Sequence, residues 1–443
     1  MARARMTSIT HRAGCNQPFL NRHLRRWLVK VLQQLRPVVA ASAAQCNAER
    51  YRKHFHSFAH FCLLVFHGLS GNQSLRQSYA AFAACPGMME ISGLAISHKA
   101  DEEALAVSFS QFADSNTTRP SDFLGGLVPF LIASVRQCGQ VPSGSLPPDI
   151  HVLDSTFLRL SLLLAPWLPN KGGADVPGVR VQLQYLPALD LPEHVLITDS
   201  HTNDCQRLDQ AILDNPSRLA ALRDQTLVFD LGYYSHRRFA RLLAAGVHLI
   251  TRLKSQAKVQ LEADLPVQSP LPDLPTGRIT ILSDQRVTVG SAQNKAGAVL
   301  TGLRLVTARV EPLPKAARAG AKVIMYRILT DRWDLDAADV IQIYLWRWQI
   351  ELFLRWLKSH VHLPRLLGYS RNAVELTVWL AIVVHLLSVL AARSLGLFNR
   401  SPGLLRQIIW ALARVGPSDA SEITIDIHQL SLPQPETGVP PPT

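Results

Sequence analysis

Hydrophobic and polar residues follow two different periods along the chain. Between residues 21 and 35 the apolar residues recur every three or four positions and basic residues fill the gaps, which predicts an amphipathic basic helix. The stretches 57–68 and 74–84 predict further helices. We therefore expect the first hundred or so residues to be helical.

The pattern changes after residues 141–148, a stretch rich in Pro, Gly and Ser that indicates a linker or turn. Short apolar or alternating runs predict strands at 150–154, 179–185, 194–198, 226–230 and 247–252, with helices at 205–213 and 236–244. A ribonuclease-H-like sheet has this order of elements: three strands, a helix, a strand, a helix and a strand. In such a sheet the first and fourth strands lie side by side.

A long inserted segment then precedes the last helix of such a fold. Proline residues and β-branched runs at 278–282, 285–289, 303–310 and 322–329 predict an inserted antiparallel sheet. Helical spacing returns from residue 337 to residue 358. The apolar run 376–392 predicts a buried helix, because it is slightly short for a bilayer and contains Thr377, His385 and Ser388.

These elements define the expected fold class and domains. The class is α/β: a ribonuclease-H-like mixed sheet with helices, interrupted by a β-strand-rich insertion and preceded by an α-helical N-terminal domain. The expected parts are a basic helical DNA-binding domain at 1–140, a catalytic core at 145–255 and 328–400, the insertion at 256–327, and a C-terminal segment at 401–443 with a disordered Pro-rich tail.

Charge is concentrated at the beginning of the chain. Residues 1–60 hold eleven Lys and Arg against one acid, which accounts for ten of the thirteen net positive charges. Such a block is either a solvated basic face or a surface for a polyanion, and it favours nucleic acid as a partner. With 47% hydrophobic and 18% charged residues, the 443-residue chain is neither disordered nor fibrous.

The six cysteines are scattered and form no C-x-x-C pair, which favours reduced thiols in a cytosolic protein. No apolar stretch follows the basic N-terminus, so a secretory signal peptide is not expected. We expect a cytoplasmic protein that associates with the nucleoid when it binds DNA, and no membrane partner.

Two predicted strands end in an aspartate. Asp154 ends the first strand and Asp230 ends the fourth, so their carboxylates meet if these strands are neighbours. A buried pair of like charges is costly unless a proton or a cation compensates it. Each aspartate alone is more often a turn or cap residue; together they suggest a metal site.

A third carboxylate lies in the predicted helix 337–358. Tyr344, Arg347, Glu351 and Lys358 share a wedge of about 60° on an ideal helix, with Arg355 at its border. One acid among cations suits a surface that faces phosphate and holds a metal ligand. Oxygen ligands alone select hard cations, so we expect Mg²⁺ or Mn²⁺, and two ions in keeping with two-metal phosphodiester chemistry.

At these residues the chain resembles bacterial insertion-sequence transposases of the DDE type, in the branch with a Tyr-x2-Arg-x3-Glu-x6-Lys signature. Tyr344, Arg347, Glu351 and Lys358 match that signature without a gap. Further agreement includes 154–156, Lys171-Gly172-Gly173, 197–199, 230–233, 250–254 and 329–331. The resemblance extends from about residue 145 to residue 390.

The resemblance implies an enzyme that cleaves phosphodiester bonds and transfers strands at the ends of an insertion sequence. It makes Asp154, Asp230 and Glu351 the metal-binding and catalytic residues. It places Tyr344, Arg347, Lys358, Lys254 and Arg355 against DNA. The implied partners are double-stranded terminal inverted repeats and target DNA, with a homodimer in the synaptic complex. Leu231 stands where the family commonly has Arg, which removes a phosphate contact there.

The sequence also offers alternatives. Asp199 and Asp204 also follow a strand and compete for the role of second acid. His54, His56, His60 and Cys62 invite a zinc site with an incomplete ligand set. Ser155 and Thr156 are expected to support the carboxylate and not to act as nucleophiles. The alternative functions are a catalytically inactive, transposase-derived DNA-binding protein and a non-transposing nuclease of the same fold.

Overall fold

The computed structural model places the chain in two compact units. One takes its described residues from the stretches before Gln140 and after His360, and the other from Val141–Ser359. The structure describes residues 17–394 except 50–54, 71–73, 95, 100–101, 106, 139–146, 161–166, 168–177, 200–205, 207, 268–277, 291–297, 313–321 and 361–365. The predicted tail, the 171–173 turn and Asp204 lie outside these residues.

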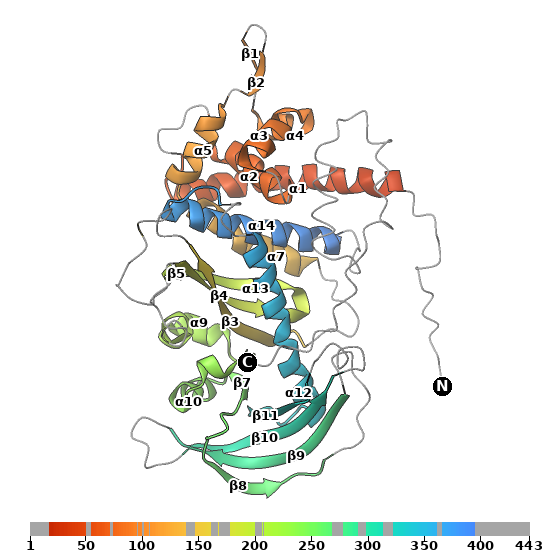
Figure 1. The fold of residues 1–443 in the computed structure, drawn as a ribbon, viewed down its shortest axis with the longest axis vertical. Coiled ribbons are helices and arrows are strands. Elements are labelled where there is room, and N and C mark those ends of the chain that lie inside the picture. Colours follow the sequence, from red (N-terminus) through yellow and green to blue (C-terminus); the bar gives the residue numbers. More distant parts are fainter. Residues whose placement is uncertain are drawn as a thin grey trace. The chain divides into compact units, whose positions relative to one another are not determined.

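The first unit is helical, as the apolar spacing predicts (Figure 1). Its helices are α1 (Gln17–Gln45), α2 (Ser57–Ser70), α3 (Leu75–Ala83), α4 (Pro86–Ser92), α5 (Phe109–Thr118), α6 (Asp122–Gly125), α7 (Val128–Gln137) and α14 (Arg371–Ser394). A two-stranded hairpin, β1 (Ile96–Lys99) with β2 (Glu102–Leu105), also belongs to it. Ser74 and Ser108 form capping boxes that fix where α3 and α5 begin.

Helix α14 is the apolar centre of this unit. It packs against α2, α5, α6 and α7. By length and composition alone it could cross a membrane, with a mean hydropathy of 2.2 over its most apolar 18 residues. However, 89% of that window is buried, so the expected buried helix at 376–392 is confirmed.

The second unit is built on a nine-stranded mixed sheet in the order β5-β4-β3-β6-β7-β11-β10-β9-β8. Its strands are β3 (Ile150–Arg159), β4 (Gly178–Leu186), β5 (Leu191–Asp199), β6 (Thr226–Phe229), β7 (His248–Arg252), β8 (Val259–Asp264), β9 (Arg278–Val289), β10 (Leu300–Glu311) and β11 (Ile324–Thr330). β3 and β6 pair in parallel, which confirms that the first and fourth predicted core strands are neighbours.

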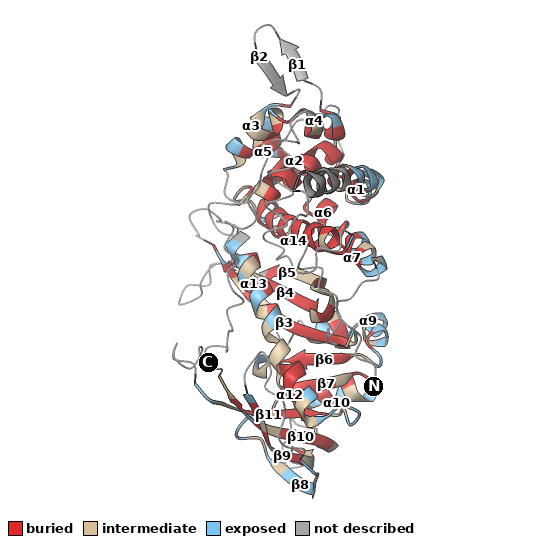
Figure 2. Ribbon diagram, turned by 90° about the vertical axis from the view of Figure 1, so that its right-hand side faces the viewer, coloured by how far each residue is buried: buried red, intermediate tan, exposed pale blue. Residues whose placement is uncertain are grey.

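The inserted strands extend the core sheet and do not form a sheet of their own. β11 pairs antiparallel with β7, and β10, β9 and β8 follow outward. The two strands predicted at 278–282 and 285–289 are a single strand, β9, because a bulge opposite Thr307 and Ala308 interrupts the alternation. β8 was not predicted; it is the exposed edge strand, whereas β6 is buried throughout (Figure 2).

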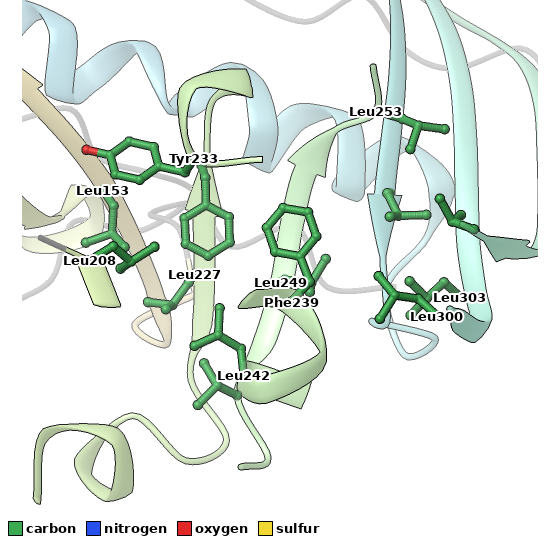
Figure 3. Close-up of a cluster of buried hydrophobic side chains, with 14 of the residues drawn as sticks. Leu153, Leu208, Leu227, Tyr233, Phe239, Leu242, Leu249, Leu253, Leu300 and Leu303 are labelled. Atoms are coloured by element: carbon green, nitrogen blue, oxygen red, sulfur yellow. The ribbon is translucent and has the colours of Figure 1, made fainter. Parts of the chain in front are cut away.

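The two faces of the sheet carry different side chains. Leu153, Leu227, Phe229, Leu249 and Leu329 belong to one apolar cluster, which packs with residues of α10 (His236–Ala244) (Figure 3). Since side chains alternate along a strand, the residues between them point to the opposite face. The ring of Phe353 lies 5.4 Å from the ring of Tyr185 on that opposite face, which places α13 (Trp348–His360) there.

The helix predicted at 337–358 is broken in the structure. It consists of α12 (Ala337–Trp346) and α13, and the interruption is at Arg347. There the backbone N–H of Arg347 donates to Tyr344 and that of Ile350 donates to Arg347, each three residues back along the chain. The prediction of one continuous helical face was therefore wrong at this residue.

Candidate active site

Asp154 and Asp230 are brought together by the parallel register of β3 and β6. Val152 pairs with Val228, so the residues two positions further along point to the same face of the sheet. Asp154 lies within β3, which continues to Arg159 and is longer than predicted. Asp230 directly follows β6 and begins the turn Leu231–Tyr233. Both aspartates thus face the side of the sheet that α13 covers.

Glu351 reaches the same place from the first turn of α13. Arg347 Nη2 lies 2.5 Å from Glu351 Oε1, and Arg347 Nη1 lies 3.6 Å from Asp154 Oδ2. The three side chains are largely buried, with exposed fractions of 28% for Glu351, 23% for Asp154 and 13% for Arg347. The structure therefore brings the first and third predicted acids to one guanidinium.

Tyr344 connects the second predicted acid to this group. Its hydroxyl donates to Asp230 Oδ1 over 3.3 Å, and its ring lies under the Arg347 guanidinium at 5.8 Å. Burial raises the pKa of Tyr344 above its ordinary value, so the hydroxyl keeps its proton and can donate. Tyr344, Arg347 and the three acids form one connected cluster despite the helix break.

The carboxylates are held in an environment that favours protonation or a bound cation. Burial raises the pKa of Asp154 to about 6; the backbone N–H of Ser155 and Arg347 oppose this, and the charges of Glu351 and Asp230 add to it. Burial also raises the pKa of Glu351, against the attraction of Arg347. Burial lowers the pKa of Arg347, but the acidic groups around it outweigh this and raise it.

Two residues of this site were missed by the sequence reasoning. The Arg252 guanidinium lies over the Tyr326 ring at 5.4 Å, and that ring lies 5.7 Å from the ring of Tyr344. Arg252 pairs with Ile328 across β7 and β11, on the face that carries Asp230. Only the order of the strands reveals this arrangement, because the two residues belong to different strands far apart in sequence.

The other predicted DNA-binding residues are exposed cations of the second unit. Lys254 is exposed just after β7, with its ammonium 5.0 Å from the ring of Tyr234. Arg355 is exposed on α13, over the ring of Trp348 at 5.5 Å. Lys358 is exposed about one turn further along α13. These cations are available to a ligand larger than a metal ion.

The residues that competed for these roles are placed elsewhere. Asp199 ends β5, the edge strand, which β4 and β3 separate from β6. The backbone N–H of Ser155 donates to Asp154 Oδ1, while the Ser155 hydroxyl accepts from Arg180. The ring of His60 is buried in the helical unit and hydrogen-bonds to Asn116, while His54 lies outside the described residues.

The chemistry of the cluster fits a hard divalent cation. Its donors are carboxylate oxygens, which are the ligands that Mg²⁺ and Mn²⁺ prefer. Among the described residues no group of three or more His, Cys, Asp or Glu side chains is placed so that it could hold a metal ion as it stands, and Arg347 lies between two of the acids. In this conformation Arg347 thus compensates part of the negative charge of the acids.

A shallow pocket open to solvent is lined in part by Asp154. Its lining includes Leu153, Gln182 and His194, which point to the face opposite α13. Burial lowers the pKa of His194, and the nearby Arg218 lowers it further. This pocket therefore lies across the sheet from the acidic cluster.

The family profile named Transposase DDE domain matches residues 145–387, which is more than half of the chain and includes all three acids. The chain belongs to the DDE transposase family. DDE transposases are enzymes that cleave DNA and transfer strands, so the reaction class implied by the resemblance is confirmed.

Three relatives of this DDE transposase are similar over much of their lengths. It is 26% identical over 285 residues to transposase y4zB of Sinorhizobium fredii, covering 63% of this chain and 70% of the relative. It is 24% identical over 270 residues to a transposase for insertion sequence element IS5377 of Geobacillus stearothermophilus, covering 60% and 63%. It is 38% identical over 285 residues to a transposase for insertion sequence element IS4SA of Synechocystis, covering 63% and 71%.

Among solved structures, the DDE transposase is similar to the piggyBac transposase in a synaptic complex with hairpin DNA. The likeness has a TM-score of 0.41 at 10% identity and covers 95% of this chain and 83% of the other.

Proposed function

We propose that this DDE transposase uses Asp154, Asp230 and Glu351 to bind divalent metal and to cleave and rejoin DNA at the ends of an insertion sequence. One observation carries the proposal: two aspartates in register on parallel strands share a cluster with a glutamate from the covering helix. The three relatives, two of them named for insertion sequence elements, support the substrate.

The metal would be held by Asp154, Asp230 and Glu351. Mg²⁺ or Mn²⁺, bound as two ions, supplies activation of the attacking oxygen and charge stabilisation of the leaving oxygen. Burial of the carboxylates strengthens their interaction with any cation, because the surroundings screen charge less than water does. The hydroxyl of Tyr344 orients Asp230 by donating to one of its oxygens.

The cations around the cluster would bind the DNA backbone. Arg347 offers a planar guanidinium that can contact two phosphate oxygens at once. Lys254, Arg355 and Lys358 are exposed and would contact the transposon end further from the scissile phosphate. Arg252 joins this set because it lies next to Tyr326 on the same face. Leu231 supplies no such contact.

The same proposal covers the name of the core fold, the partners and the place where the protein acts. The core strand order β5-β4-β3-β6-β7 matches the arrangement predicted for a ribonuclease-H-like domain and supports that name for this part of the sheet. The partners would be double-stranded terminal inverted repeats and target DNA, and the synaptic complex would hold a homodimer. The protein would act in the cytoplasm, on the nucleoid.

The test uses DNA carrying an end of the element that encodes the chain. Glu351→Gln removes a ligand charge and keeps the shape of the side chain, so it should abolish Mg²⁺-dependent cleavage and leave end binding largely intact. Glu311→Gln is the matched control, since Glu311 pairs with Arg309 on the inserted strand β10. Equal loss of binding and cleavage in Glu351→Gln would point to a structural role instead.

The same assay separates the alternative functions. An inactive DNA-binding derivative would bind the end of the element and would cleave no DNA with either Mg²⁺ or Mn²⁺. A non-transposing nuclease would cut but would not join the cut end to a target duplex. The proposed function requires both products to depend on Glu351.

A further inference from the structure

Arg347 occupies the centre of the acidic cluster. Its guanidinium contacts Glu351 and Asp154 at 2.5 Å and 3.6 Å and stacks over the ring of Tyr344 at 5.8 Å. Its side chain is 13% exposed. It therefore meets the oxygens that a metal ion would need.

The hydrogen bonding of Arg347 is incomplete in this arrangement. Its Nε–H is buried and has no hydrogen-bond partner among the residues that the structure describes. A buried donor without a partner costs free energy, so the guanidinium gains by moving to a ligand that satisfies more of its N–H groups. A phosphate group offers several acceptor oxygens and can take two N–H donors at once.

The carboxylates need a cation while no metal is bound. Two ionised acids this close together repel, and one guanidinium compensates part of their charge. A divalent ion would compensate more, but it would meet a positive charge already in place. Metal and guanidinium therefore compete for Asp154 Oδ2 and Glu351 Oε1.

We propose that Arg347 is the resident counter-ion of the metal site and couples metal loading to DNA binding. In the free protein the guanidinium holds Asp154 and Glu351 together. A DNA phosphate draws it away and frees the two carboxylates for the metal. This inference rests on the proposed function, and it assigns to Arg347 a role before the reaction begins.

The position of Arg347 suits such a movement. It lies at the interruption between α12 and α13, where the backbone makes hydrogen bonds to the third residue back instead of the fourth. Residues at the end of an element can absorb a change of backbone angle without disturbing a whole helix. Tyr344 and Glu351 lie on opposite sides of this break and stay attached to their own helices.

The experiment measures Mn²⁺ binding by electron paramagnetic resonance, with and without a DNA duplex that carries the element's end. For the wild type we expect Mn²⁺ to bind about tenfold more tightly with the duplex, and the duplex to bind more tightly by the same factor with Mn²⁺. Arg347→Gln should bind Mn²⁺ about tenfold more tightly without DNA and should lose most of this coupling.

A matched control separates local competition from general charge. Arg241→Gln removes one exposed positive charge from α10, where Arg241 pairs with Asp214 away from the acidic cluster, so its Mn²⁺ affinity without DNA should stay close to that of the wild type. If Arg347→Gln fails to fold, Arg347→Lys replaces it, because an ammonium keeps the charge but cannot bridge both acids as a planar fork does. The lysine variant should also bind Mn²⁺ more tightly without DNA.

The outcomes separate the counter-ion role of Arg347 from the metal site itself. If Arg347→Gln and the wild type bind Mn²⁺ equally without DNA and show equal coupling, the counter-ion role is overturned and the metal site stands. If Asp154→Asn and Glu351→Gln leave Mn²⁺ binding unchanged in every condition, the metal site itself is wrong.

Discussion

Asp154 and Asp230 point to the same face of the sheet because Val152 and Val228, two residues before each, pair directly across the parallel strands β3 and β6. This register places two acids side by side without any contact between distant loops. The covering helix α13 then needs to supply only one more carboxylate, and Glu351 is in its first turn. The geometry of the candidate site is thus a consequence of strand order and side-chain alternation.

The stability of the metal-free protein should depend on the charge of Asp154. Its pKa is raised from 3.8 to about 6, so the folded protein holds this proton more tightly than the unfolded chain does. Its contribution to stability is therefore greatest at low pH and is lost as the pH rises through about 6. Asp154→Asn does not titrate, so its free energy of unfolding should rise relative to that of the wild type by up to about 3 kcal/mol in all, of which about 2 kcal/mol falls above about pH 4.5.

Thermal unfolding in EDTA between about pH 4.5 and about pH 7.5 measures this difference. Asp214→Asn serves as the control, because Asp214 is an exposed acid paired with Arg241. A difference between Asp154→Asn and the wild type that stays constant with pH would contradict the assignment.

The buried pair of Arg304 and Asp284 should be a large contributor to the stability of the extended sheet. Arg304 makes two hydrogen bonds to Asp284 and also donates to the carbonyl of Leu335, just before α12. Arg304→Leu leaves Asp284 buried and unpaired, so we expect a loss of about 3–5 kcal/mol. The double variant with Asp284→Leu should be more stable than Arg304→Leu alone, as denaturant unfolding would show. Purely additive losses would mean that the pair is not coupled.

The hydroxyl of Tyr344 should matter for the reaction more than for folding. Tyr344→Phe removes the hydrogen bond to Asp230 and keeps the ring between Arg347 and Tyr326. We expect about a tenfold lower cleavage rate with a similar melting temperature, since one oriented hydrogen bond is lost. Tyr326→Phe is the control, as it keeps the same ring stack and leaves the bond to Asp230 in place. Equal cleavage rates in Tyr344→Phe and Tyr326→Phe would show that the hydrogen bond from Tyr344 to Asp230 does not contribute to the reaction.

Much of the core could be predicted because its strands alternate or are continuously apolar. The order of elements placed the first and fourth core strands together, and the acids at 154 and 230 followed from that neighbourhood. The exposed edge strand β8 was not predicted although Val259, Leu261 and Ala263 alternate with polar residues; five of its six residues are exposed, so the alternation there does not mark a buried face. The bulge in β9 concealed the continuity of that strand.

Other features depend on tertiary contacts that no local pattern contains. The helix is interrupted at Arg347 without a Gly or Pro that would predict a break, and both neighbours of Arg347 are tryptophans. Arg252 and Tyr326 reach the site only because β11 returns to pair with β7 after the insertion. The sequence indicated the three acids together with Tyr344 and Arg347, whereas Arg252 and Tyr326 required the sheet order.

The central claim is that Asp154, Asp230 and Glu351 are metal ligands, and a change of ligand chemistry tests it most directly. Asp154→Cys and Asp230→Cys replace a hard oxygen ligand with a softer thiolate, which binds Mg²⁺ poorly and Mn²⁺ better. The measurement is cleavage of the element's end in each metal. We predict that both variants lose cleavage with Mg²⁺ and recover part of it with Mn²⁺. Full cleavage with Mg²⁺, or no recovery with Mn²⁺ in a folded variant that still binds DNA, would contradict the account.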